Sequence, residues 1–290
     1  MNGAVAQTRV RVRACRECAA ALPGVVLVLA LGLVTNGVQA GRACEERPPE
    51  AAAVERGMAL ALTTAQRLEA SGADVVLLAR AGQDLGKYGL RWSHLGFAYR
   101  AEAPADPARP DAPARKVWRV VHKLNHCGTA EAALYRQGLG EFFLDRPHRY
   151  EAAFVVPSVD AQQRLLPLLR DNAQVARLHT PHYNMVAYPW AQTYQQSNQW
   201  AIELLALAME PSVSTRRDAQ AWLQQRGYEP TTLRLGALTR LGARATAANV
   251  AFDDHPNEKR FSDRIETVTA DSVFAWLQRS GLGGPAVQIP

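Results

Sequence analysis

The sequence predicts an α+β fold with a mainly antiparallel sheet. Short apolar runs of strand length are interspersed with longer stretches whose apolar residues recur at helical spacing. Two of the predicted strands, residues 89–100 and 117–125, are joined by a loop that is rich in proline and alanine and has no helical periodicity. No internal repeat is present, and the chain is long enough for one large domain, alone or with an appendage.

The first 40 residues have the three parts of a secretory signal peptide. Four arginines between residues 9 and 16 form a positive region, residues 19–34 are apolar, and "VQA" before Gly41 is a small-x-small cleavage site. Pro23 and Gly24 interrupt the apolar run, which disfavours a retained membrane anchor. We therefore expect cleavage after Ala40, a periplasmic or secreted protein, and no transmembrane segment in the mature chain.

The charge of the mature chain argues against a nucleic-acid partner. Removal of the signal takes away four arginines and one glutamate, which lowers the formal charge from +6 to +3. The remaining basic residues are scattered rather than clustered. The CxxC pair Cys15 and Cys18 lies inside the signal, so it predicts neither a zinc site nor a redox site, and we expect no metal and no cofactor.

The first half of the mature chain begins with a predicted helix, from Ala51 to Ser71, that ends in glycine. A buried strand over residues 73–82 and a turn at residues 85–89 follow it. The next predicted elements are the strand at 89–100, the loop at 101–116 and the strand at 117–125. Residues 129–145 are then predicted to be helical with a glycine break, and residues 150–158 to form another strand.

The second half alternates predicted helices with two short strands. Helical patterns cover residues 159–171, 196–209, 217–228 and 271–281. Strand patterns lie near residues 231–238 and 263–270.

Cys44 and Cys127 are the two cysteines that remain after signal removal. In an oxidising compartment two cysteines favour a structural disulfide, which here would tie the mature N-terminus to the middle of the chain. The alternative is that Cys127, in "NHCGT", is a nucleophile, which requires a free thiolate.

Two histidines, His94 and His122, lie in neighbouring predicted strands. Antiparallel neighbours bring side chains together on one face of a sheet, so one imidazole could orient the other as an acid–base partner. The alternative for each is an ordinary core or surface histidine.

The motifs around these histidines, "SHLGF" at 93–97 and "RVVHKLN" at 119–125, resemble the circularly permuted NlpC-type branch of the papain-like fold, which includes the lecithin:retinol acyltransferase group. In that branch the first motif supplies a base histidine, the next strand a polar partner, and a later helix start the nucleophilic cysteine. The resemblance implies a papain-like domain over residues 41–213, with residues 214–290 as a C-terminal extension packed on it. The chain also resembles a DUF2145-type family of exported bacterial proteins of unknown function.

The third motif of the branch corresponds to "YQQSNQWAIELL", which has no cysteine. The nucleophile position falls on Ser197, Asn198 or Ala201. A helix N-terminus stabilises an anion, so Ser197 is the candidate substitute nucleophile, with His94 as base and His122 as its orienting partner. The alternative is that Ser197 and Asn198 simply cap the helix.

Several other residues are candidates for binding in the same cleft. Asp84 precedes the His94 strand and is otherwise a turn aspartate. Tyr183 and Trp190 belong to an aromatic and histidine-rich segment that suits either a pocket wall or the core. Asn198 and Gln199 lie at the start of the later helix. The cluster Asp253, Asp254 and His255 has metal-ligand chemistry, but a solvated turn is the preferred interpretation.

Two functions from different classes follow. The first is a catalytically silent or atypical envelope protein that binds a peptide, glycan or lipid in a papain-like cleft. The second is a hydrolase or acyltransferase of amide or ester bonds that uses Ser197 in place of the cysteine.

Overall fold

The computed structural model describes residues 50–103, 115–144 and 147–290. These residues all fall within one compact unit, Val38–Pro290. The predicted signal peptide and Cys44 lie outside the described residues.

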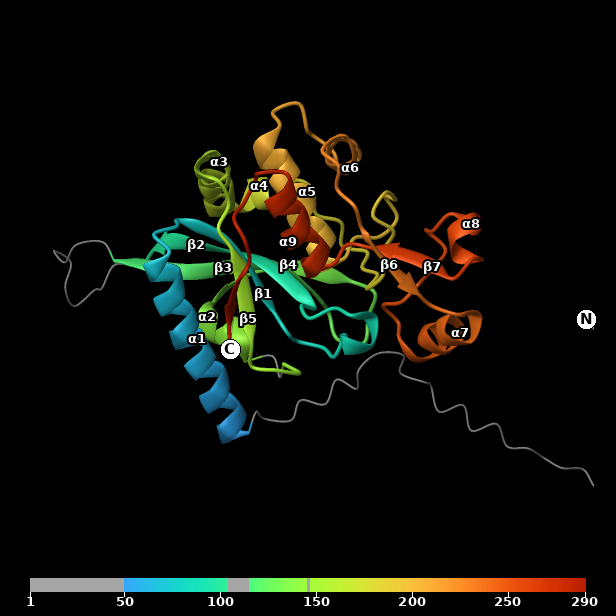
Figure 1. Ribbon diagram of the computed structural model, residues 1–290, viewed down its shortest axis with the longest axis horizontal. Helices are drawn as coiled ribbons and strands as arrows, with labels where there is room; N and C mark the ends of the chain where they lie inside the picture. The colour runs from blue at the N-terminus through green and yellow to red at the C-terminus, as the bar shows by residue number, and fades with distance from the viewer. Residues whose placement is uncertain (1–49, 104–114, 145–146) are drawn as a thin grey trace, which may run out of the picture. The chain divides into compact units, whose positions relative to one another are not determined.

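The centre of the fold is a six-stranded sheet in which every neighbouring pair is antiparallel, in the order β4-β3-β2-β1-β5-β8 (Figure 1). Its strands are β1 (Val75–Arg80), β2 (His94–Glu102), β3 (Lys116–Asn125), β4 (Ala132–Gly138), β5 (Ala152–Val155) and β8 (Val287–Ile289). The predicted α+β class with a mainly antiparallel sheet is confirmed.

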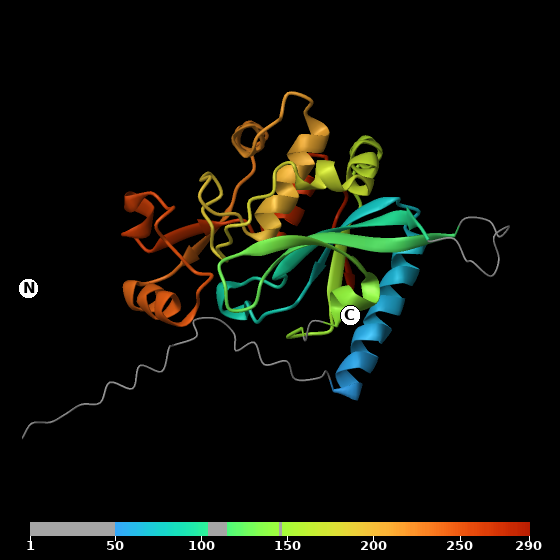
Figure 2. The same ribbon diagram turned by 180° about the vertical axis from the view of Figure 1, so that it is seen from behind.

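Helices cover both faces of this sheet (Figures 1 and 2). On one side lie α1 (Ala51–Ala70) and α2 (Leu139–Phe143), and on the other α3 (Val159–Arg170), α4 (Asn172–Ala176), α5 (Ser197–Met209), α6 (Arg216–Gln225) and α9 (Ala270–Arg279). The predicted helices at 51–71, 159–171, 196–209, 217–228 and 271–281 are thus all present.

Each face of the sheet has its own hydrophobic cluster, because successive strand side chains point in opposite directions. Val76, Leu78 and Phe142 belong to the cluster on the α1 and α2 face. Phe97 and Trp200 belong to the cluster on the α5 face, where their rings meet edge to face at 6.3 Å. This alternation decides which face each functional side chain occupies.

A second, two-stranded sheet joins β6 (Thr231–Arg234) to β7 (Arg264–Thr267), with α7 (Ala237–Thr246) and α8 (Asn257–Arg260) between them in sequence. We call residues 231–267 the β6–β7 module. Its small core centres on Leu233, Phe252 and Ile265, and packs on partly buried side chains that include Tyr88 and Val186.

The prediction of one helical segment over residues 129–145 is wrong. Residues 132–138 form β4, and only residues 139–143 are helical. β4 pairs with β3 along its whole length, from Asn125 opposite Ala132 to Arg119 opposite Gly138. Tertiary pairing of this kind overrides local helix propensity. β8 was not predicted; it places part of the 214–290 segment at the edge of the main sheet.

Candidate functional site

His94 and His122 form a directly hydrogen-bonded pair. His94 begins β2, His122 lies in β3, and the Nε2 atom of His94 is 2.8 Å from Nδ1 of His122. Gly96 makes this approach possible, since a Cβ at that position would lie 2.9 Å from the Cβ of His122. The structure therefore brings the two predicted imidazoles together on one face of the sheet.

Gln137, which the sequence analysis did not single out, extends the pair into a relay of three side chains. Its Oε1 lies 2.8 Å from Nε2 of His122. An amide oxygen only accepts hydrogen bonds, so His122 carries its proton on Nε2 and accepts at Nδ1. His94 must then donate from Nε2, which leaves Nδ1 as the acceptor atom of a neutral His94 imidazole.

Burial keeps both imidazoles neutral. Desolvation, with the neighbouring Arg80 charge and His122, lowers the pKa of His94 well below its usual value. Desolvation and Arg80 likewise lower the pKa of His122 to about 4, against an opposing hydrogen bond to Gln137. Arg80 pairs with His94 in the strand register, so its cation lies on the same face.

The relay ends at a large cavity of about 1020 Å³. Arg80, His94, Gln137 and Glu141 line one part of it. Nδ1 of His94 makes no hydrogen bond within the described part of the chain, and it is not fully enclosed by protein atoms. The free lone pair of His94 is therefore accessible from the cavity.

The rest of the cavity wall is mixed in character. Its apolar side chains come from several segments and include Leu85, Leu90, Trp92, Met185, Val250 and Phe252. Its polar side chains include Asp84, Tyr183, Gln196, Ser197 and Asn198. Such a lining of apolar walls with a few polar groups is typical of ligand sites.

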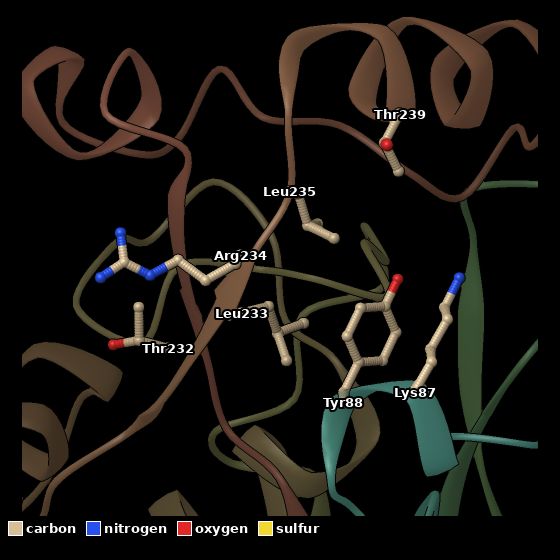
Figure 3. Close-up of a pocket in the computed structure, with 7 residues that line it drawn as sticks. All are labelled: Lys87, Tyr88, Thr232, Leu233, Arg234, Leu235 and Thr239. Atoms are coloured by element: carbon tan, nitrogen blue, oxygen red, sulfur yellow. The ribbon is translucent and has the colours of Figure 1, made fainter.

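A smaller cavity of about 380 Å³ adjoins the large one, and the two share Tyr88, Leu233, Leu235 and Thr239. Figure 3 shows the side chains of Lys87 and Tyr88 extending toward the side where Thr239 lies on α7. The Lys87 ammonium stacks over the Tyr88 ring at 4.7 Å.

Ser197 lines the large cavity but makes no hydrogen bond to His94. Its side chain contacts the Tyr183 hydroxyl instead, and burial raises the pKa of that phenol to about 12. Leu95 and Phe97 are in the cluster packed on α5, so strand alternation directs His94 and His122 to the opposite face of the sheet. The structure thus does not provide the Ser197–His94 bond that the nucleophile hypothesis requires.

Neither Ser197 nor Asn198 is the N-cap residue of α5, so the capping alternative is wrong. The N-cap residue of α5 is Gln196, whose side chain accepts a hydrogen bond from the Asn198 backbone N–H. Asn198 donates from Nδ2 to the Val268 carbonyl, and its Oδ1 is buried without a partner among the described residues.

The other predicted binding residues divide into two groups. Asp84, Tyr183 and Asn198 line the large cavity. Gln199 instead donates to the Tyr188 and Pro189 carbonyls, and Trp190 packs edge to face on Tyr228 at 6.1 Å. Gln199 and Trp190 thus support the loop before α5 rather than the cavity wall.

Cys127 also lines the large cavity, and it is disulfide-bonded. This state is incompatible with a free thiolate nucleophile. Because Cys44 lies outside the described residues, the pairing of Cys44 with Cys127 stays a prediction.

In the Asp253, Asp254 and His255 cluster, only Asp253 fits the expected solvated turn, since it is exposed. The side chains of Asp254 and His255 are fully buried, and His255 Nδ1 lies 2.9 Å from Asp254 Oδ1. Asp254 also accepts a hydrogen bond from the Tyr188 backbone N–H, while His255 Nε2 faces the Glu266 carbonyl. The pair therefore anchors the β6–β7 module to the segment before α5.

A buried polar network on the α5 face was not predicted. Glu203 of α5 is fully buried and binds the Arg216 guanidinium, with Nε 2.8 Å and Nη2 3.1 Å from its two oxygens. Gln195 bridges Glu203 to Lys123, whose ammonium also donates to the Thr180 carbonyl. Burial lowers the pKa of Lys123 to about 7. The sequence carried no signal for this network, because its members are far apart in the chain.

In the part of the chain that the structure describes, no three His, Cys, Asp or Glu side chains group closely enough to hold a metal ion. None of the described helices is both long and apolar enough to cross a bilayer.

Comparisons with known proteins give one family. No curated protein and no solved structure matches the chain. The family DUF2145, described as an uncharacterized protein conserved in bacteria, matches residues 67–277, which is more than half of the chain. The protein therefore belongs to the DUF2145 family.

Proposed function

We propose that this protein is an exported binding protein of the bacterial cell envelope, which takes a peptide, glycan or lipid into its large cavity without carrying out nucleophilic catalysis. The observation that supports this most directly is the cavity itself, with the accessible Nδ1 of His94 in its wall and no nucleophile of the described residues bonded to that atom. The motifs "SHLGF" and "RVVHKLN" lie on adjacent antiparallel strands with their histidines paired, which supports a papain-like, permuted NlpC-type ancestry.

The part of the cavity wall that holds His94 suits a hydrogen-bond donor on the ligand. A neutral imidazole whose other nitrogen is already engaged is an acceptor of fixed orientation. The apolar side chains elsewhere in the wall suit a ligand that also has a hydrophobic part. An amphipathic peptide or lipid satisfies both requirements better than a plain glycan does.

The test uses an amphipathic fluorescent probe, anilinonaphthalene sulfonate, displaced in turn by a muropeptide, a glycan-strand disaccharide and lysophosphatidylglycerol. We expect saturable probe binding that one of these classes displaces. Ala243 of α7 lines the cavity, so Ala243→Trp should weaken binding at least about tenfold by filling it. Ala245 of the same helix does not line the cavity, and Ala245→Trp is the matched control.

An absence of saturable, displaceable binding would contradict the proposal, as would equal losses in the two tryptophan variants. Replacing His94 with Phe should weaken the displacing ligand selectively, while probe binding through the apolar wall is retained.

The second candidate, a hydrolase or acyltransferase, is supported by the His94–His122–Gln137 relay, since such chains orient a general base. If Ser197 is the nucleophile, Ser197→Ala and His94→Ala should abolish hydrolysis of p-nitrophenyl butyrate to a similar extent, because members of one catalytic unit fail together. The binding proposal expects no turnover in the unmodified protein.

A further inference from the structure

Helix α7 has two chemically different faces. Thr239 and Ala243 of the helix, with the C-cap residue Ala247, line the large cavity. At 3.6 residues per turn, Leu238, Leu241 and Ala245 lie on the opposite side of the helix. One side of α7 is thus a cavity wall, and the other faces away from the cavity.

The outward side is apolar and exposed. Leu238 is 86% exposed and Leu241 is 66% exposed, and α7 contains no buried residue. A single exposed leucine is ordinary on a protein surface. Here two leucines stand one turn apart on the same helix, and no other described segment packs over them.

The β6–β7 module, to which these leucines belong, carries six basic and five acidic residues, a formal charge of +1. α7 contains Arg240 and Arg244 and no acidic residue. Arg244 is exposed, as are Arg234 of β6 and Arg264 of β7, and none of these three forms an ion pair within the described ranges. Of the five acidic residues of the module, Asp254 pairs with His255, Asp263 with Arg240 and Glu266 with Lys259. Asp253 and Glu258 are exposed and form no ion pair with any other described residue.

We propose that α7 docks the protein on the anionic surface of a lipid bilayer. Amphipathic helices with apolar residues on one side and flanking cations lie in the plane of the interface, where the apolar side enters the boundary between headgroups and acyl chains. The arginines interact with anionic headgroups. This proposal stands on the exposed face of α7 and does not depend on which ligand occupies the cavity.

Docking through α7 also places a wall of both cavities at the bilayer. Thr239 lines the large and the small cavity, and Lys87 and Tyr88 extend toward its side of the small one (Figure 3).

The test is flotation of the mature protein with vesicles of phosphatidylcholine alone and of phosphatidylcholine mixed with phosphatidylglycerol. We expect binding to the anionic vesicles that weakens at high salt. The double variant Leu238→Glu and Leu241→Glu should lose at least about tenfold in partitioning. Leu62→Glu is the matched control, since Leu62 is 62% exposed on α1, and it should bind as the wild type does.

A second pair of variants isolates the charge. Arg244→Glu should weaken binding to anionic vesicles, whereas Arg67→Glu, an exposed arginine on α1, should not. The proposal is overturned if the wild type floats with neither vesicle, or if the α1 variants lose as much as the α7 variants. It is also overturned if light scattering shows a dimer for the wild type and a monomer for the α7 double variant, while flotation is unchanged. In that case α7 would join two copies of the chain. Circular dichroism should show that all variants are folded, as expected for exposed positions.

Discussion

The Nε2 atom of His94 lies 2.8 Å from Nδ1 of His122, and this contact couples β2 to β3 through side chains as well as through the backbone ladder. Both imidazoles are buried and neutral. The contact therefore requires that neither ring takes up the proton that a histidine in water would accept. Its pH dependence is the first property to test.

Acidification should destabilise the protein through this pair. The pKa of His122 is lowered to about 4 by burial, whereas the unfolded chain titrates near the usual 6.5, so acid protonates the unfolded chain first. The contribution of His122 to stability is therefore full above the unfolded value of 6.5 and falls as the pH drops toward 4, by on the order of 3 kcal/mol. Urea unfolding at several pH values measures this slope.

The slope should be smaller in His122→Gln, because that variant removes the group that titrates. His182→Gln is the control, since the His182 side chain is 66% exposed. Equal slopes in all three proteins would contradict the assignment of the effect to the buried pair.

Lys123 should produce a second pH effect, in the alkaline range. Burial lowers its pKa to about 7 from 10.5, so the unfolded chain binds the extra proton between these values and stability rises with pH across them. Between pH 7 and pH 9 we expect a gain of roughly 2 kcal/mol in the wild type. Lys123→Met should abolish the gain, and the exposed Lys116→Met should keep it.

The Glu203–Arg216 pair should be essential for stability. Glu203→Gln keeps the shape of the side chain but leaves the Arg216 cation buried without a counterion, which costs about 3–5 kcal/mol. Arg164→Gln, which breaks the exposed pair with Asp160, should change stability by about 0.5 kcal/mol or less. Chemical unfolding measures the loss of stability in both variants. Similar losses would show that burial does not determine how much an ion pair contributes to stability.

Gly96 should be intolerant of a methyl group. In Gly96→Ala the new Cβ would meet the His122 Cβ at 2.9 Å and the Val120 Cγ1 at 3.0 Å, so β3 must shift at a cost of about 1–3 kcal/mol. Imidazole NMR signals should show a changed His94–His122 hydrogen bond. Gly242→Ala, inside α7 and with open space around it, should instead raise stability by up to about 1 kcal/mol, because alanine is the better helix former.

We expect the protein to be exported, its mature form to begin at Gly41, and that form to contain no free thiol. Cleavage is expected there because the apolar region ends just before a small-residue tripeptide. N-terminal sequencing checks the cleavage site. Alkylation and mass measurement check the Cys44–Cys127 pairing. A chain that retains Met1, or one that takes up alkylating reagent without reduction, would refute the corresponding prediction.

The sequence was informative where local pattern determines structure. The 3.6-residue periodicity of residues 51–71 and 196–209 predicted α1 and α5, and apolar runs of strand length predicted β1, β2 and β3. The pattern failed at residues 132–138, where pairing with β3 makes a strand of a segment with good helix formers.

Local pattern likewise predicted one part of the candidate site and not the rest. The prediction of two adjacent strands was sufficient to expect that His94 and His122 meet. The position of Gln137 beside His122 depends on the register of β4, which no local pattern encodes. The face of the sheet that each residue occupies depends on the alternation within β2, and this alternation separates His94 from the helix that carries Ser197. Gln196, rather than Ser197, caps α5 because the backbone enters the helix one residue earlier than the cap preferences indicated.

The strand order β4-β3-β2-β1-β5-β8 also has a kinetic consequence. β1 to β4 pair in sequence order, so each contact closes a short loop and loses little chain entropy. β8 pairs with β5 across more than a hundred residues, a contact that costs more entropy to form and forms slowly. The meander from β1 to β4 should therefore assemble first during folding, and amides of the β5–β8 ladder should gain protection from hydrogen exchange last.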